Sequence, residues 1–111
     1  EAEKCGRAAR LATDAATLLG RDLTVSPDEL FTDQSYIGAG YGIATEGGLE
    51  AIHLLAELEG ILIDPVYTAK AMAALIADVR AGQIDPGETI VFLHTGGAPA
   101  LFAHSRTLGL E

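Results

Sequence analysis

The chain has 111 residues, of which 49% are hydrophobic, and it carries a net charge of −9. The length is typical of one domain, and the apolar fraction is too high for a disordered chain. Only seven residues are Lys or Arg, which argues against binding to nucleic acid or to an anionic membrane surface, because both need basic patches. The single cysteine, Cys5, excludes an internal disulfide and is typical of a reducing compartment. With no apolar run as long as a membrane span, the sequence predicts a soluble, cytoplasmic protein.

Two helices are predicted in the first half of the chain, where apolar residues recur every three or four positions. The first covers residues 3–19 and ends at Gly20. Its apolar face consists of Ala8, Leu11, Ala12, Ala15, Leu18 and Leu19. After a less regular stretch with a short strand expected at 23–25, Thr45 is the N-cap candidate of the second helix, which ends at Gly60. The buried face of this helix is predicted to consist of Ala51, Leu54, Leu55 and Leu58.

A third helix is predicted where Asp64 supplies a cap and Pro65 the first helical residue. It ends near Gly82, and a turn then leads into the apolar segment 89–94. The apolar face of this helix consists of Met72, Leu75, Ile76 and Val79. A last short helix is expected after Gly97.

The segment 89–94, TIVFLH, has the pattern of a strand that is buried on both faces of a parallel sheet. The only other strand candidates are the shorter segments 23–25 and 61–63. One to three short strands are too few to bury such a segment. We therefore expect its pairing strands to come from another chain or from the rest of a larger α/β protein.

Two glycine-containing segments are candidates for a ligand site. Thr95, Gly96 and Gly97 follow the end of the predicted strand, where open α/β sheets bind ligands and free N–H groups attract anions. On this pattern alone, a tight connection without a ligand is favoured. Tyr41 lies between two glycines just before the second helix, where a phenol can donate a proton or stack on a ring. The alternative is a loop tyrosine that fills the core.

A third candidate is the start of the third helix, which carries Tyr67, Thr68 and Lys70. A lysine at such a place can form a Schiff base. The favoured interpretation is nevertheless a solvated lysine on a helix face, because nothing in the sequence indicates that Lys70 is buried. The three histidines do not have the spacing of a zinc motif, and no metal is assigned.

Together and in this order, the segments GYGIATEGGLEAIHLLAELEGILIDPVYTAKAMAALIADVRAG and GETIVFLHTGGAPALFAH resemble the C-terminal part of one family of pyridoxal-phosphate enzymes. This family comprises D-cysteine desulfhydrase and 1-aminocyclopropane-1-carboxylate deaminase, and the resemblance covers about residues 36–104. It implies fold type II, the tryptophan-synthase-β type, which is a three-layer α/β fold with a parallel sheet. Residues 1–111 would then form a single C-terminal segment of the larger cofactor-binding domain, incomplete on its own.

The resemblance also implies roles for individual residues. Tyr41 matches the family's tyrosine beside the substrate, and Tyr67 matches a second active-site tyrosine. Thr95 matches the residue whose hydroxyl faces the pyridine nitrogen of pyridoxal phosphate, which makes the ring a milder electron sink than a carboxylate partner would. The neighbouring Gly96, and Thr68 in the tyrosine motif, are expected to contribute to cofactor binding.

Two positions separate the branches of the family. The deaminase branch resembles VYEGK and HLGG, with a glutamate after the tyrosine that can pair with the ring nitrogen. This chain has Thr68 and Thr95 at the corresponding positions. The resemblance therefore favours the desulfhydrase branch, which eliminates a β-substituent from an amino acid and releases ammonia, a keto acid and, from cysteine, sulfide. The sulfo-lyases that act on cysteate have similar sequences and remain an alternative.

The family's Schiff-base lysine, its phosphate-binding glycine loop and a substrate-binding serine lie in an N-terminal half that has no match here. Neither Lys4 nor Lys70 has the context of that lysine. The chain is therefore interpreted as a C-terminal fragment of a lyase, inactive alone, whose partners are the missing N-terminal half or a complementary chain and a small amino-acid substrate. The alternatives are a non-catalytic module that pairs as a homodimer, and a phosphate-binding domain that uses Gly96 and Gly97.

Overall fold

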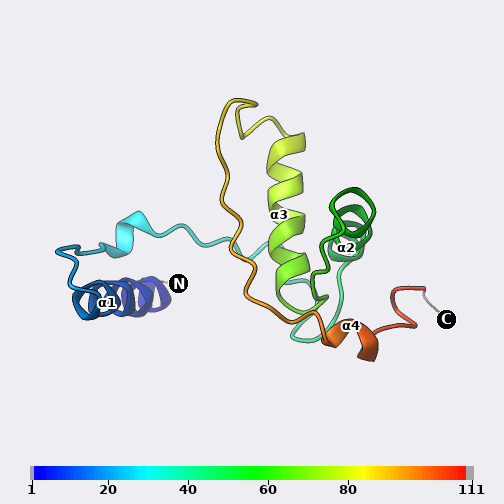
Figure 1. Cartoon of the computed structure of the whole chain (residues 1–111), viewed down its shortest axis with the longest axis horizontal. Helices are drawn as coiled ribbons and strands as arrows, with labels where there is room; N and C mark the ends of the chain where they lie inside the picture. Colours follow the sequence, from blue (N-terminus) through cyan, green and yellow to red (C-terminus); the bar gives the residue numbers. More distant parts are fainter. Residues whose placement is uncertain (1, 110–111) are drawn as a thin grey trace. The chain divides into compact units, whose positions relative to one another are not determined.

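The computed structural model describes residues 2–109 as helices joined by turns and extended segments (Figure 1). The helical elements are α1 (Ala2–Leu18), the 3-10 helix η1 (Pro27–Glu29), α2 (Glu46–Glu59), α3 (Thr68–Arg80) and α4 (Ala100–Ala103). The contacts divide the chain after Gln34 into two compact units. The predicted helices are confirmed, although α3 begins three residues later than Pro65.

In the first unit, α1 is buried through small side chains. Its buried residues are Cys5, Ala9 and Ala16, and the hydroxyl of Thr13 accepts a hydrogen bond from the N–H of Val25 at 3.0 Å. The predicted apolar face of this helix is wrong. Ala8, Leu11, Ala15, Leu18 and Leu19 are exposed. The segment that returns through η1 covers the side of α1 that carries the small residues, where the backbones can approach closely.

In the second unit, α2 and α3 pack against each other. The hydroxyl of Thr45 caps α2 by accepting a hydrogen bond from the N–H of Gly48 at 3.1 Å, and Gly60 ends the helix in the left-handed conformation, with φ 66°. Both predictions are confirmed. A Cβ added at Gly48 would lie 3.6 Å from the Cβ of Ala69, so these two small residues let α2 approach α3 closely.

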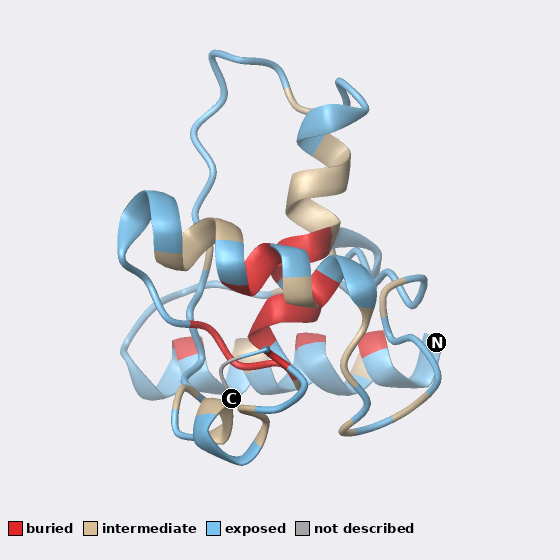
Figure 2. Ribbon diagram, turned by 90° about the vertical axis from the view of Figure 1, so that its right-hand side faces the viewer, coloured by how far each residue is buried: buried red, intermediate tan, exposed pale blue. Residues whose placement is uncertain are grey.

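The core of the second unit lies where the N-terminal halves of α2 and α3 meet (Figure 2). The buried core residues are Ala51, Ile52, Ile63, Ala69, Met72 and Leu108. Ile52 was not predicted to be buried, whereas Leu58 and Val79, which were, are exposed. Leu58 and Val79 lie near the C-terminal ends of their helices, beyond the region of contact, so the apolar stripe continues further than the packing does.

The predicted strands are not formed, and the described part of the chain contains no β-strand. Residues 89–94 are instead an extended segment in which Val91 is 88% and Leu93 is 78% exposed. The segments 23–25 and 61–63 are also without strand structure. A strand exists only through hydrogen bonds to a neighbouring strand, and the described residues bring no such neighbour beside 89–94. The parallel sheet expected from the sequence is therefore not built by these residues.

Candidate functional site

Asp64 organises the start of α3. Its side chain, 1% exposed, accepts hydrogen bonds from the N–H groups of Val66 and Tyr67, both at 2.8 Å, and of Thr68 at 2.9 Å. The Thr68 hydroxyl donates to the same carboxylate at 2.6 Å and accepts from the N–H of Asp64 at 2.8 Å. Asp64 therefore caps the turn of residues 65–67 and fixes the backbone from which the Tyr67 side chain projects. The predicted helix cap is displaced, because the N-cap position of α3 is Tyr67, which makes no side-chain cap bond.

The electrostatics of Asp64 follow from these contacts. Burial of the carboxyl disfavours its charged form and by itself would raise the pKa. The hydrogen bonds from the Thr68 side chain and from the three backbone N–H groups favour the charged form and outweigh burial. The pKa of Asp64 therefore lies below its ordinary value of 3.8, and the carboxylate is charged at neutral pH.

The turn at the end of segment 89–94 also reaches Asp64. Gly97 lies so close that a Cβ added to it would be 2.6 Å from the Cγ of Asp64. Nearby, the N–H of Gly96 donates to Nδ1 of His94 at 3.0 Å, which leaves Nε2 as the donor to the carbonyl of Leu62 at 2.9 Å. The turn that carries two of the predicted cofactor-binding residues is thus attached to the start of α3.

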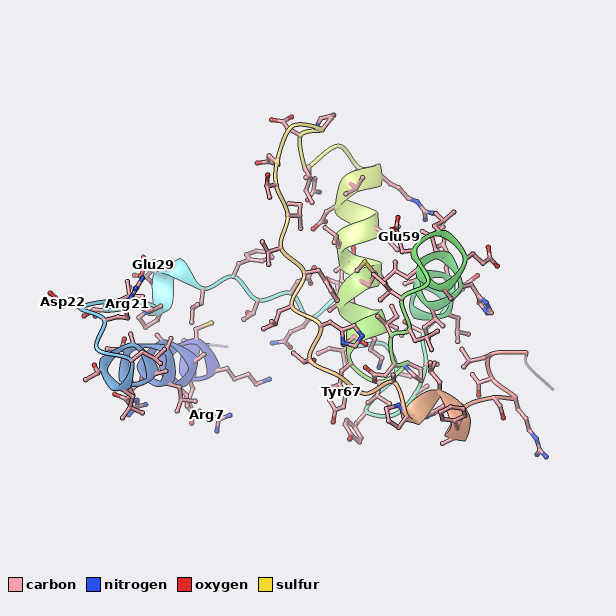
Figure 3. All side chains as sticks on the ribbon, in the orientation of Figure 1. Arg7, Arg21, Asp22, Glu29, Glu59 and Tyr67 are labelled. Atoms are coloured by element: carbon pink, nitrogen blue, oxygen red, sulfur yellow. The ribbon has the colours of Figure 1, made fainter. Side chains whose placement is uncertain are left out.

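The two predicted catalytic tyrosines are in direct contact, although 26 positions separate them. The hydroxyl oxygens of Tyr41 and Tyr67 are 2.7 Å apart, and the rings meet edge to face with centroids 5.8 Å apart. Figure 3 labels Tyr67 at the lower end of α3, beside the chain that leads to α4. Tyr41 is 80% and Tyr67 is 57% exposed, so the paired hydroxyls remain open to a ligand.

The pKa of Tyr67 is raised above its ordinary value of 10.0, chiefly because its hydroxyl is hydrogen-bonded to Tyr41. Desolvation and the nearby charges of ionised Tyr41 and of Asp64 act in the same direction. At neutral pH Tyr67 therefore keeps its phenol proton, and one proton lies between the two oxygens. Such a pair can donate a proton to a group bound beside it, or accept one from it.

Replacing Tyr41 by phenylalanine is expected to lower the pKa of Tyr67 toward 10.0, because it removes the largest cause of the shift. The chain has three tyrosines and no tryptophan, so the ultraviolet absorbance of tyrosinate during a pH titration measures this change directly. Tyr36→Phe is the matched control and should not change the transition that occurs at the highest pH, which is that of Tyr67. An unchanged highest transition in Tyr41→Phe would show that the two hydroxyls do not interact in solution.

The prediction that Lys70 is a solvated lysine on a helix face is wrong. The residue is 8% exposed, and its Nζ donates to the carbonyl oxygens of Ile37 at 2.6 Å and of Gly40 at 3.1 Å. The side chain thus reaches from α3 to the glycine-rich loop of residues 37–44, which carries Tyr41. With its ammonium group engaged by two carbonyls, Lys70 is not available as a free amine.

The predicted cofactor-binding residues differ in their accessibility. Thr95 and Gly96 are exposed, and Gly96 has φ 100°, a conformation in which its backbone can approach a ligand without a Cβ in the way. Thr68, by contrast, is buried, and its hydroxyl is hydrogen-bonded to both the backbone N–H and the carboxylate of Asp64. An open hydroxyl and a glycine turn suit one edge of a planar cofactor such as pyridoxal phosphate. The amine needed to bind that cofactor covalently is not among these residues.

A cavity of about 560 Å³ lies elsewhere in the second unit, between α2, α3 and the start of the glycine-rich loop. The Arg80 guanidinium closes one part of it by a two-point ion pair with Glu50, at 2.6 and 3.2 Å. None of the predicted site residues lines this cavity. Among the described residues, no group of three or more His, Cys, Asp or Glu side chains could hold a metal ion, and no helix is long and apolar enough to cross a bilayer.

Comparison with known proteins identifies the class of protein to which this chain belongs. The model of the family "Pyridoxal-phosphate dependent enzyme" matches residues 1–96, a range that includes both tyrosines and the turn at Thr95 and Gly96. The chain belongs to this family, as its motifs predict. Pyridoxal phosphate is the cofactor of the family, and fold type II is the fold that membership implies.

A curated relative narrows the comparison. Over 98 residues the chain is 47% identical to the 1-aminocyclopropane-1-carboxylate deaminase of Burkholderia multivorans (strain ATCC 17616 / 249). The match covers 86% of this chain and 28% of that protein. The chain thus spans less than a third of the length of its relative, and most of the relative's residues have no counterpart here.

Two features of the candidate site were not foreseen from the sequence: the contact of Asp64 with Gly97 and the burial of Lys70. Asp64 was predicted as a cap, but nothing in the sequence indicated its contact with Gly97, which is distant along the chain. The burial of Lys70 becomes understandable only in the structure, where it directly follows the buried Ala69 and lies three residues before the buried Ala73. A lysine within a row of buried alanines has to find acceptors for its ammonium group.

Proposed function

We propose that this chain forms the C-terminal part of a pyridoxal-phosphate-dependent lyase that acts on a small β-substituted amino acid. The observation that carries the proposal is the pair of exposed hydroxyls of Tyr41 and Tyr67, 2.7 Å apart, in a chain of this family. Such a pair can bind a small polar substrate and exchange a proton with it. Most of the surface around the pair would be supplied by a part of the enzyme that corresponds to the unmatched residues of the relative.

The reaction proposed is that of a desulfhydrase. With D-cysteine as substrate, the bond between Cβ and sulfur breaks, one water is consumed, and pyruvate, ammonia and hydrogen sulfide are released. The cofactor supplies an electron sink for the carbon skeleton when it is bound. Tyr41 and Tyr67 would hold the substrate and provide a proton for the leaving sulfur, a role that suits a hydrogen-bonded pair of phenols.

Thr95, Gly96 and Thr68 would hold the cofactor. The exposed hydroxyl of Thr95 is suited to the ring nitrogen, and the backbone of Gly96 to close approach. Thr68 would contribute through its fixed position beside Tyr67, since its hydroxyl is already bonded to Asp64. The amine that binds pyridoxal phosphate covalently would come from the N-terminal part, because Lys70 is engaged with two carbonyls.

The segment 89–94 also supports the proposal that this chain is completed by an N-terminal part of the enzyme. Its exposed apolar side chains, including Val91 and Leu93, and its unpaired backbone are suited to insertion between two strands of a parallel sheet. Both compact units of the chain would then be parts of one larger cofactor-binding domain. The partner that we propose is the N-terminal part of the enzyme, in a soluble cytoplasmic protein.

The substrate is the point on which two observations differ. Thr68 and Thr95 favour a desulfhydrase, because the deaminase pattern has a glutamate and a leucine there. The 47% identity to a protein named 1-aminocyclopropane-1-carboxylate deaminase favours a deaminase. We give more weight to the two residues, since they lie where the cofactor ring is expected, whereas overall identity reflects all of the matched positions equally.

A chimaera tests this proposal. The stretch of the Burkholderia protein that aligns with this chain is replaced by the corresponding residues of the chain, and the product is purified with pyridoxal phosphate. We expect bound cofactor by absorbance, sulfide release from D-cysteine, and little ammonia from 1-aminocyclopropane-1-carboxylate. Double replacement of Thr68 by Glu and Thr95 by Leu in the chimaera should reverse this preference.

Three outcomes decide between the alternatives. A folded chimaera that deaminates 1-aminocyclopropane-1-carboxylate but releases no sulfide would assign the chain to the deaminase branch. Sulfite release from cysteate instead would indicate a sulfo-lyase. A folded chimaera that binds the cofactor and transforms none of the three substrates would contradict the proposal.

A further inference from the structure

Lys70 joins α3 to the glycine-rich loop that carries Tyr41. Its Nζ lies 2.6 Å from the carbonyl oxygen of Ile37 and 3.1 Å from that of Gly40. These carbonyls are four and one residues before Tyr41 in the chain. The contact therefore fixes the peptide that immediately precedes the tyrosine.

Within the loop, the described backbone hydrogen bonds are limited to the one from the N–H of Ile43 to the carbonyl of Gly40, at 3.4 Å. Gly38, which lies between the two contacted carbonyls, and Gly42, which follows Tyr41, adopt φ values of 71° and 75°. Glycine reaches this conformation easily, but the conformation does not by itself select one path for the chain. Residues 37–44 contain no helix or strand. A buried ammonium with two carbonyl acceptors is the strongest described constraint on the loop, because hydrogen bonds from a charged donor are stronger than neutral ones.

Tyr67 is positioned from the other side. Its backbone N–H is bound to Asp64, and it directly precedes the first residue of α3. Lys70 lies three residues further along, on the same first turn. The same turn of helix thus provides one phenol of the pair and, through a lysine, determines where the other phenol lies.

We propose that Lys70 is a positioning residue, whose ammonium group places Tyr41 so that its hydroxyl meets that of Tyr67. The catalytic significance of this positioning rests on the proposed function, but the positioning itself does not. Lys70 acts through the backbone at Ile37 and Gly40 and contacts neither hydroxyl in the described hydrogen bonds.

The side chain's length and charge both matter for this role. Four methylene groups carry the ammonium from a buried helix position to the loop, and its three N–H donors can serve two carbonyls at once. Methionine has a stem of similar size but no donor, and would leave both carbonyl oxygens without this partner. Arginine keeps the charge, but its planar guanidinium cannot place its donors as a lysine does.

The test reads the tyrosine pair and needs neither cofactor nor substrate. The 111-residue chain is prepared with 3-fluorotyrosine at position 67 only, and its fluorine resonance is recorded at neutral pH. Tyr41→Phe defines the resonance of a broken pair. We expect Lys70→Met to move the resonance most of the way to that value, whereas Lys4→Met, at an exposed lysine of α1, leaves it unchanged.

Two further variants keep the test decisive. In a Tyr41→Phe background, Lys70→Met should cause no further shift, because Lys70 is proposed to act on this resonance only through Tyr41. If Lys70→Met loses its helical circular dichroism, Lys70→Arg decides, and we expect wild-type helicity with a resonance displaced toward that of Tyr41→Phe. A folded Lys70→Met, or in its place a folded Lys70→Arg, with the wild-type resonance would overturn the proposal.

This readout is separate from that of the proposed function. Failure of the chimaera to act on any substrate would leave the fluorine result unaffected. Conversely, an active chimaera combined with an unmoved fluorine resonance would retain the function and remove the role assigned to Lys70.

Discussion

Replacing Asp64 by alanine is expected to lower the free energy of unfolding by about 3 kcal/mol, because buried donors lose a charged acceptor. The side chain is 1% exposed and accepts from three backbone N–H groups and one hydroxyl. The loss would be a large fraction of the stability of a small domain. Urea unfolding followed by circular dichroism measures it.

The control for this variant is Asp85→Ala, at an exposed aspartate of a turn in the same unit. It should change the free energy of unfolding by no more than about 0.5 kcal/mol. Asp64→Asn should lie between the two, since it keeps one acceptor oxygen but loses the charge. Equal stabilities of Asp64→Ala and Asp85→Ala would contradict the capping role.

The contribution of Asp64 also has a definite pH dependence. Its pKa is lower in the folded chain than its ordinary value of 3.8, so the folded state binds its proton less readily than the unfolded state does. The stabilisation is therefore complete above the ordinary pKa and is lost as the pH falls through the lower pKa of the folded state. Between neutral pH and strongly acidic pH, the difference in stability between the wild-type chain and Asp64→Asn should shrink.

The second large effect is expected at the glycine turn. Gly97→Ala should destabilise the chain more than Gly96→Ala, although the two residues have similar φ values of 95° and 100°. Each substitution forces a Cβ into a left-handed conformation, at about 1–2 kcal/mol. Only at Gly97 does the new Cβ meet Asp64, at 2.6 Å from its Cγ, and this overpacking adds about 1–3 kcal/mol.

The pair of glycine variants therefore isolates one contact. A Cβ at Gly96 has no neighbour within 4 Å, so the difference between the two free energies of unfolding measures the contact with Asp64. In an Asp64→Ala background this difference should become smaller but should not vanish, because the Cβ of Asp64, which would lie 2.9 Å from the new Cβ, is still present. A difference of the same size in both backgrounds would show that the carboxylate of Asp64 is not the source of the strain.

Local features were the ones that could be predicted from the sequence. The cap at Thr45 and the left-handed stop at Gly60 each depend on residues within four positions, and each is confirmed. The family motifs were also recognisable, because they are short and keep a fixed order. What these features share is that the residues that define them lie near one another along the chain.

The errors have a common physical origin in partners that are distant in sequence or belong to no described residue. Lys70 finds its acceptors 30 and 33 positions away, at Gly40 and Ile37, and no pattern around the lysine indicates them. Segment 89–94 has the composition of a strand, but strand structure requires a second backbone. Leu11 belongs to an apolar stripe of α1 that was expected to be buried. The residues of α1 that are buried lie on another side of the helix, at Cys5, Ala9 and Ala16.

The contacts of Asp64 have a consequence for the order in which the chain folds. The hydrogen bonds of its side chain join residues at most four positions apart, so only a very short loop has to close before they form. The Tyr41–Tyr67 pair joins residues 26 positions apart, and its formation has to offset a larger loop-closure entropy. Refolding rates of Asp64→Ala and Tyr41→Phe would show whether the first is slowed more. The hydroxyl pair is then assembled late on a turn of helix that is already formed, so local opening of the loop can separate the two phenols while the start of α3 remains intact.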